Sequence, residues 1–150
     1  MVVSNDASAE VVTYSLGSCL GITVYDPAKR VGGLLHVMLP DSKIDAAKAS
    51  RSPFMFVDTG VPRLFQAVYN LGGDRNRVVI KVAGGAQLLD PGGIFNIGER
   101  NFTILSTLLA RNGYSINARD VGGVVSRTIR LDMGTGKVSV KAPAVAPYFL

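Results

Sequence analysis

The arrangement of apolar and polar positions divides this chain into many short strands and two amphipathic helices. Alternating or densely β-branched segments, bounded by turn residues, favour strands at seven places. These predicted strands cover residues 11–14, 19–25, 30–39, 77–83, 114–121, 124–132 and 137–141, and the tail at 143–150 is expected to be irregular. Apolar residues recur at helical spacing over residues 61–71 and 97–112. The pattern therefore predicts a strand-rich chain with two helices.

Residues typical of helix ends flank both predicted helices. Asp58 or Thr59 can cap the first helix, and Gly72 can end it. Asn96 stands at the start of the second helix, and Gly113 follows its end. The residues that turn toward the interior are Val61, Leu64, Phe65, Val68 and Leu71 in the first helix and Leu105, Leu108 and Leu109 in the second. Each helix needs a sheet face to cover its apolar side.

A β-hairpin is predicted around the Asp-Pro-Ala-Lys sequence at 26–29. Proline at the second position of this sequence presets the φ angle of a type I turn. If 26–29 form the loop, Tyr25 pairs with Arg30, and the same register places Cys19 directly opposite His36. A slip of one residue would instead put His36 on the other face. The pairing of cysteine and histidine is therefore a hypothesis about register.

These elements predict an α+β fold, with strand-rich sheets packed against two main helices. A chain of 150 residues that is 47% hydrophobic is long enough to bury one sizeable core. Its glycines and prolines lie between the apolar runs and form turns, including a glycine-rich loop that begins at Gly84. We expect residues 1–150 to form a single domain.

The sequence contains one cysteine, so an internal disulfide is impossible and a reducing compartment is expected. No apolar run approaches the roughly 20 residues needed to cross a bilayer, and residues 1–10 are polar. We expect a cytoplasmic protein without membrane insertion.

A net charge of +5 favours acidic partners, which the charge alone does not identify. The basic residues are scattered and no stacking motif accompanies them, so we do not expect nucleic-acid binding. Gly84-Gly85 lacks the Lys-Ser/Thr end of a phosphate-binding loop, and a lone cysteine with a lone histidine is too few ligands for zinc. We therefore expect no cofactor and no metal.

Cys19 and His36 are the candidates for chemistry, because an imidazole beside a thiol can take its proton and lower its pKa. Glycines at 17 and 21 leave backbone N–H groups near the sulfur free to hold a developing oxyanion. However, a lone cysteine is often a small buried apolar residue, and a lone strand histidine is often structural. The residues alone leave both interpretations open.

Blocks along nearly the whole chain resemble the chemoreceptor glutamine deamidases, the CheD family. The resemblance is carried by Leu16-Gly17-Ser18-Cys19, Tyr25-Asp26-Pro27, Gly32-Gly33-Leu34-Leu35-His36, Met38-Leu39-Pro40, Asp58-Thr59, Lys81-Val82-Ala83-Gly84-Gly85-Ala86, Ile97-Gly98-Glu99-Arg100-Asn101, Asp120-Val121-Gly122-Gly123 and Arg127. The order of these blocks is specific, although any one of them would be a weak signal. The family's fold is similar to a layered α/β sandwich of glutamine-deamidating toxins.

This resemblance implies a catalytic group of Cys19, His36 and Thr13. Gly17 and Ser18, directly before the cysteine, are the candidates for the oxyanion and substrate site. Cys19 would attack a glutamine side-chain amide, His36 would serve as acid and then as base, and Thr13 would orient the imidazole. The implied substrates are glutamines of chemoreceptor cytoplasmic helices, which become glutamates with release of ammonia, and the phosphatase CheC is an implied partner. Two alternatives remain, namely a catalytically silent adaptor and a methylesterase acting on receptor glutamyl methyl esters.

Overall fold

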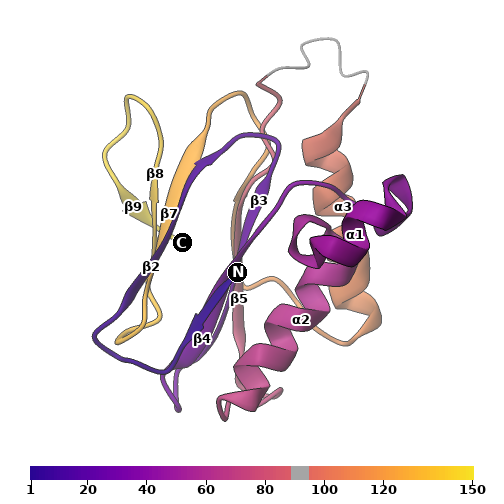
Figure 1. Cartoon of the computed structure of the whole chain (residues 1–150). Coiled ribbons are helices and arrows are strands. Elements are labelled where there is room, and N and C mark those ends of the chain that lie inside the picture. Colours follow the sequence, from indigo (N-terminus) through magenta and orange to yellow (C-terminus); the bar gives the residue numbers. More distant parts are fainter. Residues whose placement is uncertain (89–94) are drawn as a thin grey trace.

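A computed structural model describes residues 1–88 and 95–150 and shows three layers (Figure 1). The strands are β1 (Val2–Ser4), β2 (Glu10–Leu16), β3 (Leu20–Asp26), β4 (Val31–Val37), β5 (Val79–Gly84), β6 (Ala118–Val121), β7 (Arg127–Asp132), β8 (Val138–Lys141) and β9 (Tyr148–Phe149). The helices are α1 (Ala46–Arg51), α2 (Val57–Asn70) and α3 (Ile97–Arg111), with short 3-10 turns η1 (Ser42–Ile44) and η2 (Pro53–Met55). The predicted α+β layered class is confirmed.

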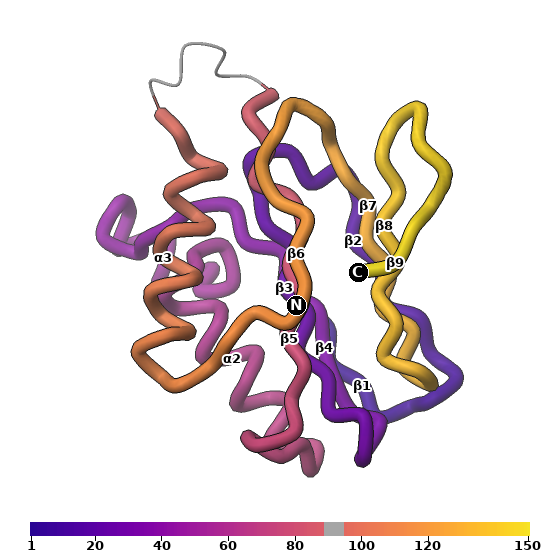
Figure 2. Tube along the Cα trace, turned by 180° about the vertical axis from the view of Figure 1, so that it is seen from behind, coloured from indigo at the N-terminus to yellow at the C-terminus, as the bar shows by residue number. Residues whose placement is uncertain are grey.

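The strands form a five-stranded sheet in the order β1-β4-β3-β5-β6 and a four-stranded sheet in the order β2-β7-β8-β9. Neighbouring strands are antiparallel except β5 and β6, which are parallel and are connected through α3. Helices α2 and α3 cover one face of the five-stranded sheet, and the four-stranded sheet covers the other (Figures 1 and 2).

Two apolar cores follow from this layering. One lies between the helices and the five-stranded sheet and includes Leu35, Leu64 and Leu105. The other lies between the two sheets and includes Leu16 and Ile129. All seven residues of β3 are buried, because the helices cover one face of this strand and the four-stranded sheet covers the other.

The hairpin of β3 and β4 exists, but its predicted register is wrong. Asp26 pairs with Val31 and Gly21 pairs with His36, so Cys19 does not lie directly opposite His36. The loop begins one residue later than predicted, because the Asp26 carboxylate accepts hydrogen bonds from the N–H groups of Ala28 and Lys29 and so stays at the strand end. The partner of His36 is thus Gly21 and not Cys19, a shift of two residues along β3. A shift of two residues leaves each side chain on its predicted face of the sheet.

Helix α2 begins at Val57, before either predicted cap, and no side chain caps it. Asp58 instead accepts hydrogen bonds from the N–H and hydroxyl of Ser42, and Thr59 donates to the carbonyl of Pro53. Their side chains serve the preceding turns, so this prediction was wrong. Asn96 does precede α3, although its side chain makes no capping bond there.

The chain termini contain more regular structure than the pattern predicted. Strand β1 pairs with β4, and β9 pairs with β8 in the tail that was expected to be irregular. Both are short edge strands, and each pairs with a single neighbouring strand. Their three and two residues are too few to show a periodic pattern in the sequence. Helix α1 was also not predicted. The glycine-rich loop that begins at Gly84 extends into residues 89–94, which lie outside the described residues.

Candidate active site

Cys19 lies in the bend that connects β2 of one sheet to β3 of the other. The N–H of Gly85 donates to the carbonyl of Cys19 at 2.8 Å, and the N–H of Ala86 donates to the carbonyl of Gly17 at 2.7 Å. A Cβ at Gly84 would collide with the Cys19 carbonyl oxygen, and its φ of +114° also favours glycine. The end of β5 therefore holds the cysteine bend in place.

His36 and Thr13 meet across the space between the sheets. The Thr13 Oγ1 lies 2.8 Å from the His36 Nδ1, with Thr13 on β2 and His36 on β4. Thr13 is buried and His36 is half-buried. A hydroxyl at Nδ1 fixes the ring orientation and leaves Nε2 to take or give a proton. This is the partner that the resemblance implied for Thr13.

Cys19 lies on the same side of the five-stranded sheet as His36. Gly21, opposite His36, faces the methyl groups of Leu16 and Ile129 in the core between the sheets, and Cys19 packs against that core. Cys19 is two residues before Gly21, so it and His36 are diagonal neighbours. In the described part of the chain, no hydrogen bond joins the Cys19 thiol to the imidazole.

The electrostatic environment keeps both groups neutral. Burial raises the pKa of the Cys19 thiol, and the residue's own backbone N–H opposes that rise. Burial lowers the pKa of His36, and the positive chain N-terminus lowers it further. The expected lowering of the thiol pKa was wrong for this state, because desolvation outweighs the residue's own backbone N–H and no hydrogen bond from the imidazole reaches the sulfur.

A cavity of about 390 Å³ opens beside Cys19. Its walls comprise Ser15, Gly17, Ser18, Cys19, Ala86, Gln87, Leu88, Phe95, Asn96, Ile97 and Gly98. The start of α3 approaches the end of β5 so closely that a Cβ at Gly98 would lie 2.9 Å from the Cα of Gly85. Within the described chain, the backbone N–H groups of Ser18 and Cys19 donate to no backbone carbonyl, and the Cys19 N–H faces the sulfur of its own residue. Both lie beside the cavity, and the oxyanion role expected of Gly17 and Ser18 stays a prediction.

The sequence interpretation gave no role to Asn101, which is fully buried on α3. Its side-chain Nδ2 donates to the carbonyls of Ser18 at 3.0 Å and Met38 at 3.2 Å. A sequence signal existed, because Asn101 precedes Leu105 by one helical turn and therefore lies on the apolar face of α3.

In residues 1–88 and 95–150, no three His, Cys, Asp or Glu side chains lie closely enough together to hold a metal ion. Across the same ranges, no helix has the length and apolarity required to cross a membrane.

Comparison with known proteins identifies relatives along most of the chain. The family model described as CheD chemotactic sensory transduction matches residues 38–142, a range that leaves out Thr13, Cys19 and His36. A probable chemoreceptor glutamine deamidase CheD 1 from Syntrophus aciditrophicus (strain SB) is 48% identical over 140 residues, or 93% of this chain and 88% of the relative.

Two further relatives show the same likeness. A probable chemoreceptor glutamine deamidase CheD from Solibacter usitatus (strain Ellin6076) is 45% identical over 85% of this chain and 76% of its own length. A probable chemoreceptor glutamine deamidase CheD 2 from Anaeromyxobacter dehalogenans (strain 2CP-C) is 41% identical over 98% of this chain and 93% of its own length. With such coverage, and with the family model matching more than half of its residues, this chain belongs to the CheD family.

Proposed function

We propose that this protein deamidates glutamine side chains of chemoreceptors, with Cys19 as nucleophile, His36 as acid and base, and Thr13 as the residue that orients His36. The observation that carries this proposal is the Thr13–His36 hydrogen bond on the side of the five-stranded sheet where Cys19 packs. Cys19 also borders a cavity, which neither Thr13 nor His36 lines. The reaction and the substrate class are supported by the relatives, which are described as probable chemoreceptor glutamine deamidases.

The reaction begins when His36 Nε2 accepts the thiol proton and Cys19 Sγ attacks the amide carbon of the glutamine side chain. Backbone N–H groups of the cysteine bend stabilise the oxyanion of the tetrahedral intermediate. As the C–N bond breaks, His36 returns its proton to the leaving nitrogen, and ammonia departs. A γ-glutamyl thioester remains on Cys19.

Hydrolysis of this thioester completes the cycle. His36, again neutral, takes a proton from water, and the hydroxide attacks the thioester carbonyl. The C–S bond then breaks, the thiolate is reprotonated by His36, and a glutamate side chain is released. One water molecule is consumed and one ammonia is formed for each glutamine.

The neutral state of both groups is compatible with this scheme. A thiol whose pKa is raised and an imidazole whose pKa is lowered give little thiolate before substrate binds. Proton transfer then accompanies attack, and catalytic hydrogen bonds that are absent without substrate often form in the complex.

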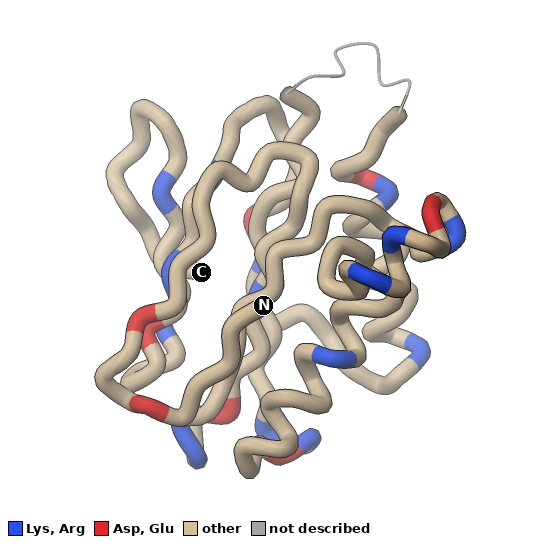
Figure 3. The backbone as a smooth tube through the Cα atoms, in the orientation of Figure 1, with Lys and Arg blue, Asp and Glu red and all other residues tan. Residues whose placement is uncertain are grey.

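The substrate surface is proposed from charge. The chain carries a net charge of +5, and Figure 3 shows basic positions distributed over the helical layer and the loop ends. A basic protein is attracted to helices rich in glutamate, such as chemoreceptor cytoplasmic domains.

The family resemblance also supports CheC as a proposed partner. We also keep receptor methylesterase activity, which the same thiolate could catalyse.

The decisive experiment incubates a chemoreceptor cytoplasmic fragment with the protein and measures conversion of glutamine to glutamate by mass spectrometry. Conversion is expected with the wild type and absent with Cys19→Ala. Ser50→Ala on α1 is the matched control and should retain full activity. A methyl-esterified fragment assayed in parallel tests ester hydrolysis. Persistent conversion by Cys19→Ala would exclude the nucleophile, and no conversion across several receptors would favour the adaptor.

A further inference from the structure

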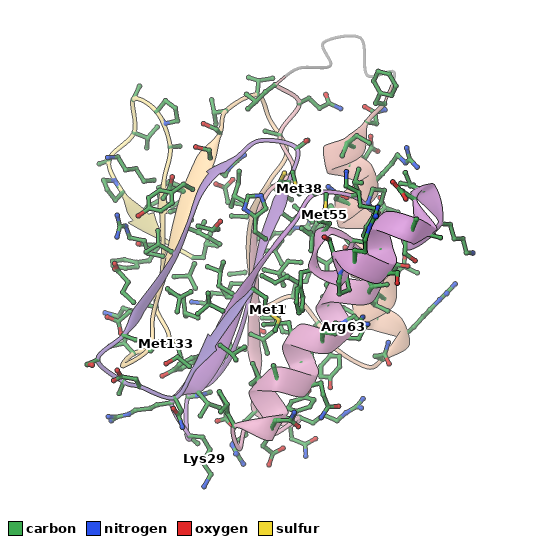
Figure 4. All side chains as sticks on the ribbon, in the orientation of Figure 1. Met1, Lys29, Met38, Met55, Arg63 and Met133 are labelled. Carbon is green, nitrogen blue, oxygen red and sulfur yellow. The ribbon has the colours of Figure 1, made fainter. Side chains whose placement is uncertain are left out.

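Asn101 connects three elements that surround the nucleophile. It lies in the second turn of α3, and its carboxamide reaches the carbonyl of Ser18 in the cysteine bend and the carbonyl of Met38 just after β4. Met38 in turn donates its N–H to Met55 at 2.8 Å, and the two methionines lie close together in Figure 4. One buried side chain thus joins the nucleophile bend to the strand that carries His36.

The orientation of this carboxamide follows from its surroundings. Both neighbours are carbonyl oxygens, which accept hydrogen bonds, so the NH2 group must face them. The Oδ1 is consequently left buried with no partner among the described residues. A buried unpaired carbonyl is costly, and a residue chosen only to fill space would be apolar. This arrangement calls for a role beyond packing.

The contact with Ser18 has a geometric consequence for Cys19. The Ser18 carbonyl and the Cys19 N–H belong to one peptide unit, and in a planar trans peptide these two groups point in opposite directions. Holding the carbonyl toward Asn101 therefore turns the Cys19 N–H away from the interior of the helix layer. That N–H donates to no other residue of the described chain but faces the sulfur of its own residue, and Cys19 borders the cavity.

We propose that Asn101 is a positioning residue for the oxyanion site: by holding the Ser18 carbonyl it aims the Cys19 N–H at the substrate oxygen. The inference rests on the proposed thiol chemistry, and it adds a role that acts through the peptide bond instead of through the sulfur. The second bond, to Met38, keeps the end of β4 at a constant distance from the nucleophile bend.

Two small reagents separate this role from a general structural one. Acetyl transfer from p-nitrophenyl acetate to Cys19 forms a C–S bond through a tetrahedral oxyanion and expels p-nitrophenolate. Alkylation by iodoacetamide also forms a C–S bond at Cys19 but displaces iodide directly, with no oxyanion. A donor that acts only on the oxyanion affects the first reaction and not the second.

The principal variant is Asn101→Leu, which keeps the side-chain shape and removes the donors. Its acylation rate is expected to fall about 10- to 100-fold while its alkylation rate stays within about 2-fold of wild type. Asn101→Ser, which is too short to reach either carbonyl, should show the same ratio if the leucine variant folds poorly. Asn112→Leu changes the asparagine directly after α3, which also donates to a backbone carbonyl; it is the matched control and should change neither rate.

Three outcomes would overturn the proposal. They are an unchanged acylation rate in both Asn101 variants, equal losses in acylation and alkylation, and wild-type acylation no faster than that of Cys19→Ala. Neither reagent is a glutamine, so the assay does not depend on a receptor substrate. A specific acylation defect without receptor deamidation would refute the proposed function and leave this inference intact.

Discussion

At the residue scale, the chemistry of this site depends on how each group is solvated. His36 and Cys19 are both about half-buried, so both are displaced toward their neutral forms. Thr13 is a neutral hydrogen-bond partner and, unlike an aspartate, does not raise the basicity of the imidazole through charge. The site therefore relies on orientation more than on a permanent ion pair.

Loss of the threonine hydroxyl should impair turnover more than binding. Thr13→Val keeps the β-branched shape and removes the bond to His36 Nδ1, so kcat for deamidation is expected to fall about 10-fold or more with KM nearly constant. Steady-state kinetics on a receptor fragment measure this effect. Thr13→Ser should restore most of the activity, and Thr128→Val on β7 serves as the strand control. A fall confined to KM would contradict the orienting role.

The pH dependence of thiol alkylation tests the neutral pair. Because burial raises the thiol pKa, the rate of iodoacetamide alkylation of Cys19 should keep increasing above the ordinary cysteine pKa of about 8.5. Its measurement between neutral and alkaline pH requires no substrate. A rate that already reaches a plateau below neutral pH would indicate a thiolate–imidazolium pair and contradict this assignment.

The acidic limb of the pH–rate profile for deamidation should be shifted to lower pH. His36 must be neutral to accept the thiol proton, and its lowered pKa keeps it neutral to a pH below the usual value of about 6.5. The value of kcat/KM should therefore decline only below that pH, as measured by deamidation across an acidic pH series. A decline centred above 6.5 would show that His36 is not desolvated as described.

At the element scale, the site is assembled where three segments approach closely. The cysteine bend is hydrogen-bonded to the end of β5, and the start of α3 packs on the same glycine-rich end. Glycine at 98 permits this approach, because the backbone of Gly85 occupies the place of a side chain. The shape of the cavity therefore depends on the spacing between these backbone segments as well as on the side chains that line it.

Gly98→Ala should separate α3 from the end of β5. The added methyl collides with the Gly85 backbone, so we expect a loss of about 1–3 kcal/mol in unfolding free energy and a lower deamidation rate. Chemical denaturation and the receptor assay measure the two effects. Thr107→Ala, at an exposed position of the same helix, should change neither. Full stability and activity in Gly98→Ala would show that the helix accommodates the methyl without displacement.

At the scale of the whole molecule, the end opposite the site is stabilised by a buried carboxylate. Asp26 is fully buried, receives two hydrogen bonds from Arg77, and also accepts from the N–H groups of Asp74, Ala28 and Lys29. Burial alone would raise the pKa of Asp26, but the Arg77 guanidinium and these N–H groups outweigh it and lower the pKa to about 2.

Asp26→Asn should destabilise the fold by about 2 kcal/mol or more near neutral pH, because charge-assisted hydrogen bonds are lost. The folded pKa lies below the unfolded value of about 3.9, so the carboxylate stabilises the protein above that pH. Its contribution then disappears as the pH falls from about 4 to about 2. The difference between variant and wild type should shrink over this window in denaturation experiments. A constant difference would exclude the ionised carboxylate as its cause.

We also propose that residues 1–150 unfold as one domain, because β3 contributes to both apolar cores through neighbouring residues. Denaturation followed by two probes, one reporting helices and one reporting Tyr25 between the sheets, should give coincident transitions. Separate midpoints would indicate two independently stable units.

The sequence by itself determined the principal strands, the two long helices and the family, because periodic patterns and ordered motif blocks are local signals. It also identified Cys19, His36 and Thr13 as candidates, although only resemblance connected Thr13 with the other two. The tertiary structure decided the hairpin register, because the Asp26 side chain defines where the turn begins. It also decided the meeting of Thr13 with His36, the neutral state of the thiol and the place of Asn101. The contact of Thr13 with His36, the neutral thiol and the hydrogen bonds of Asn101 to Ser18 and Met38 depend on how separate layers pack and exclude water, which no local pattern encodes.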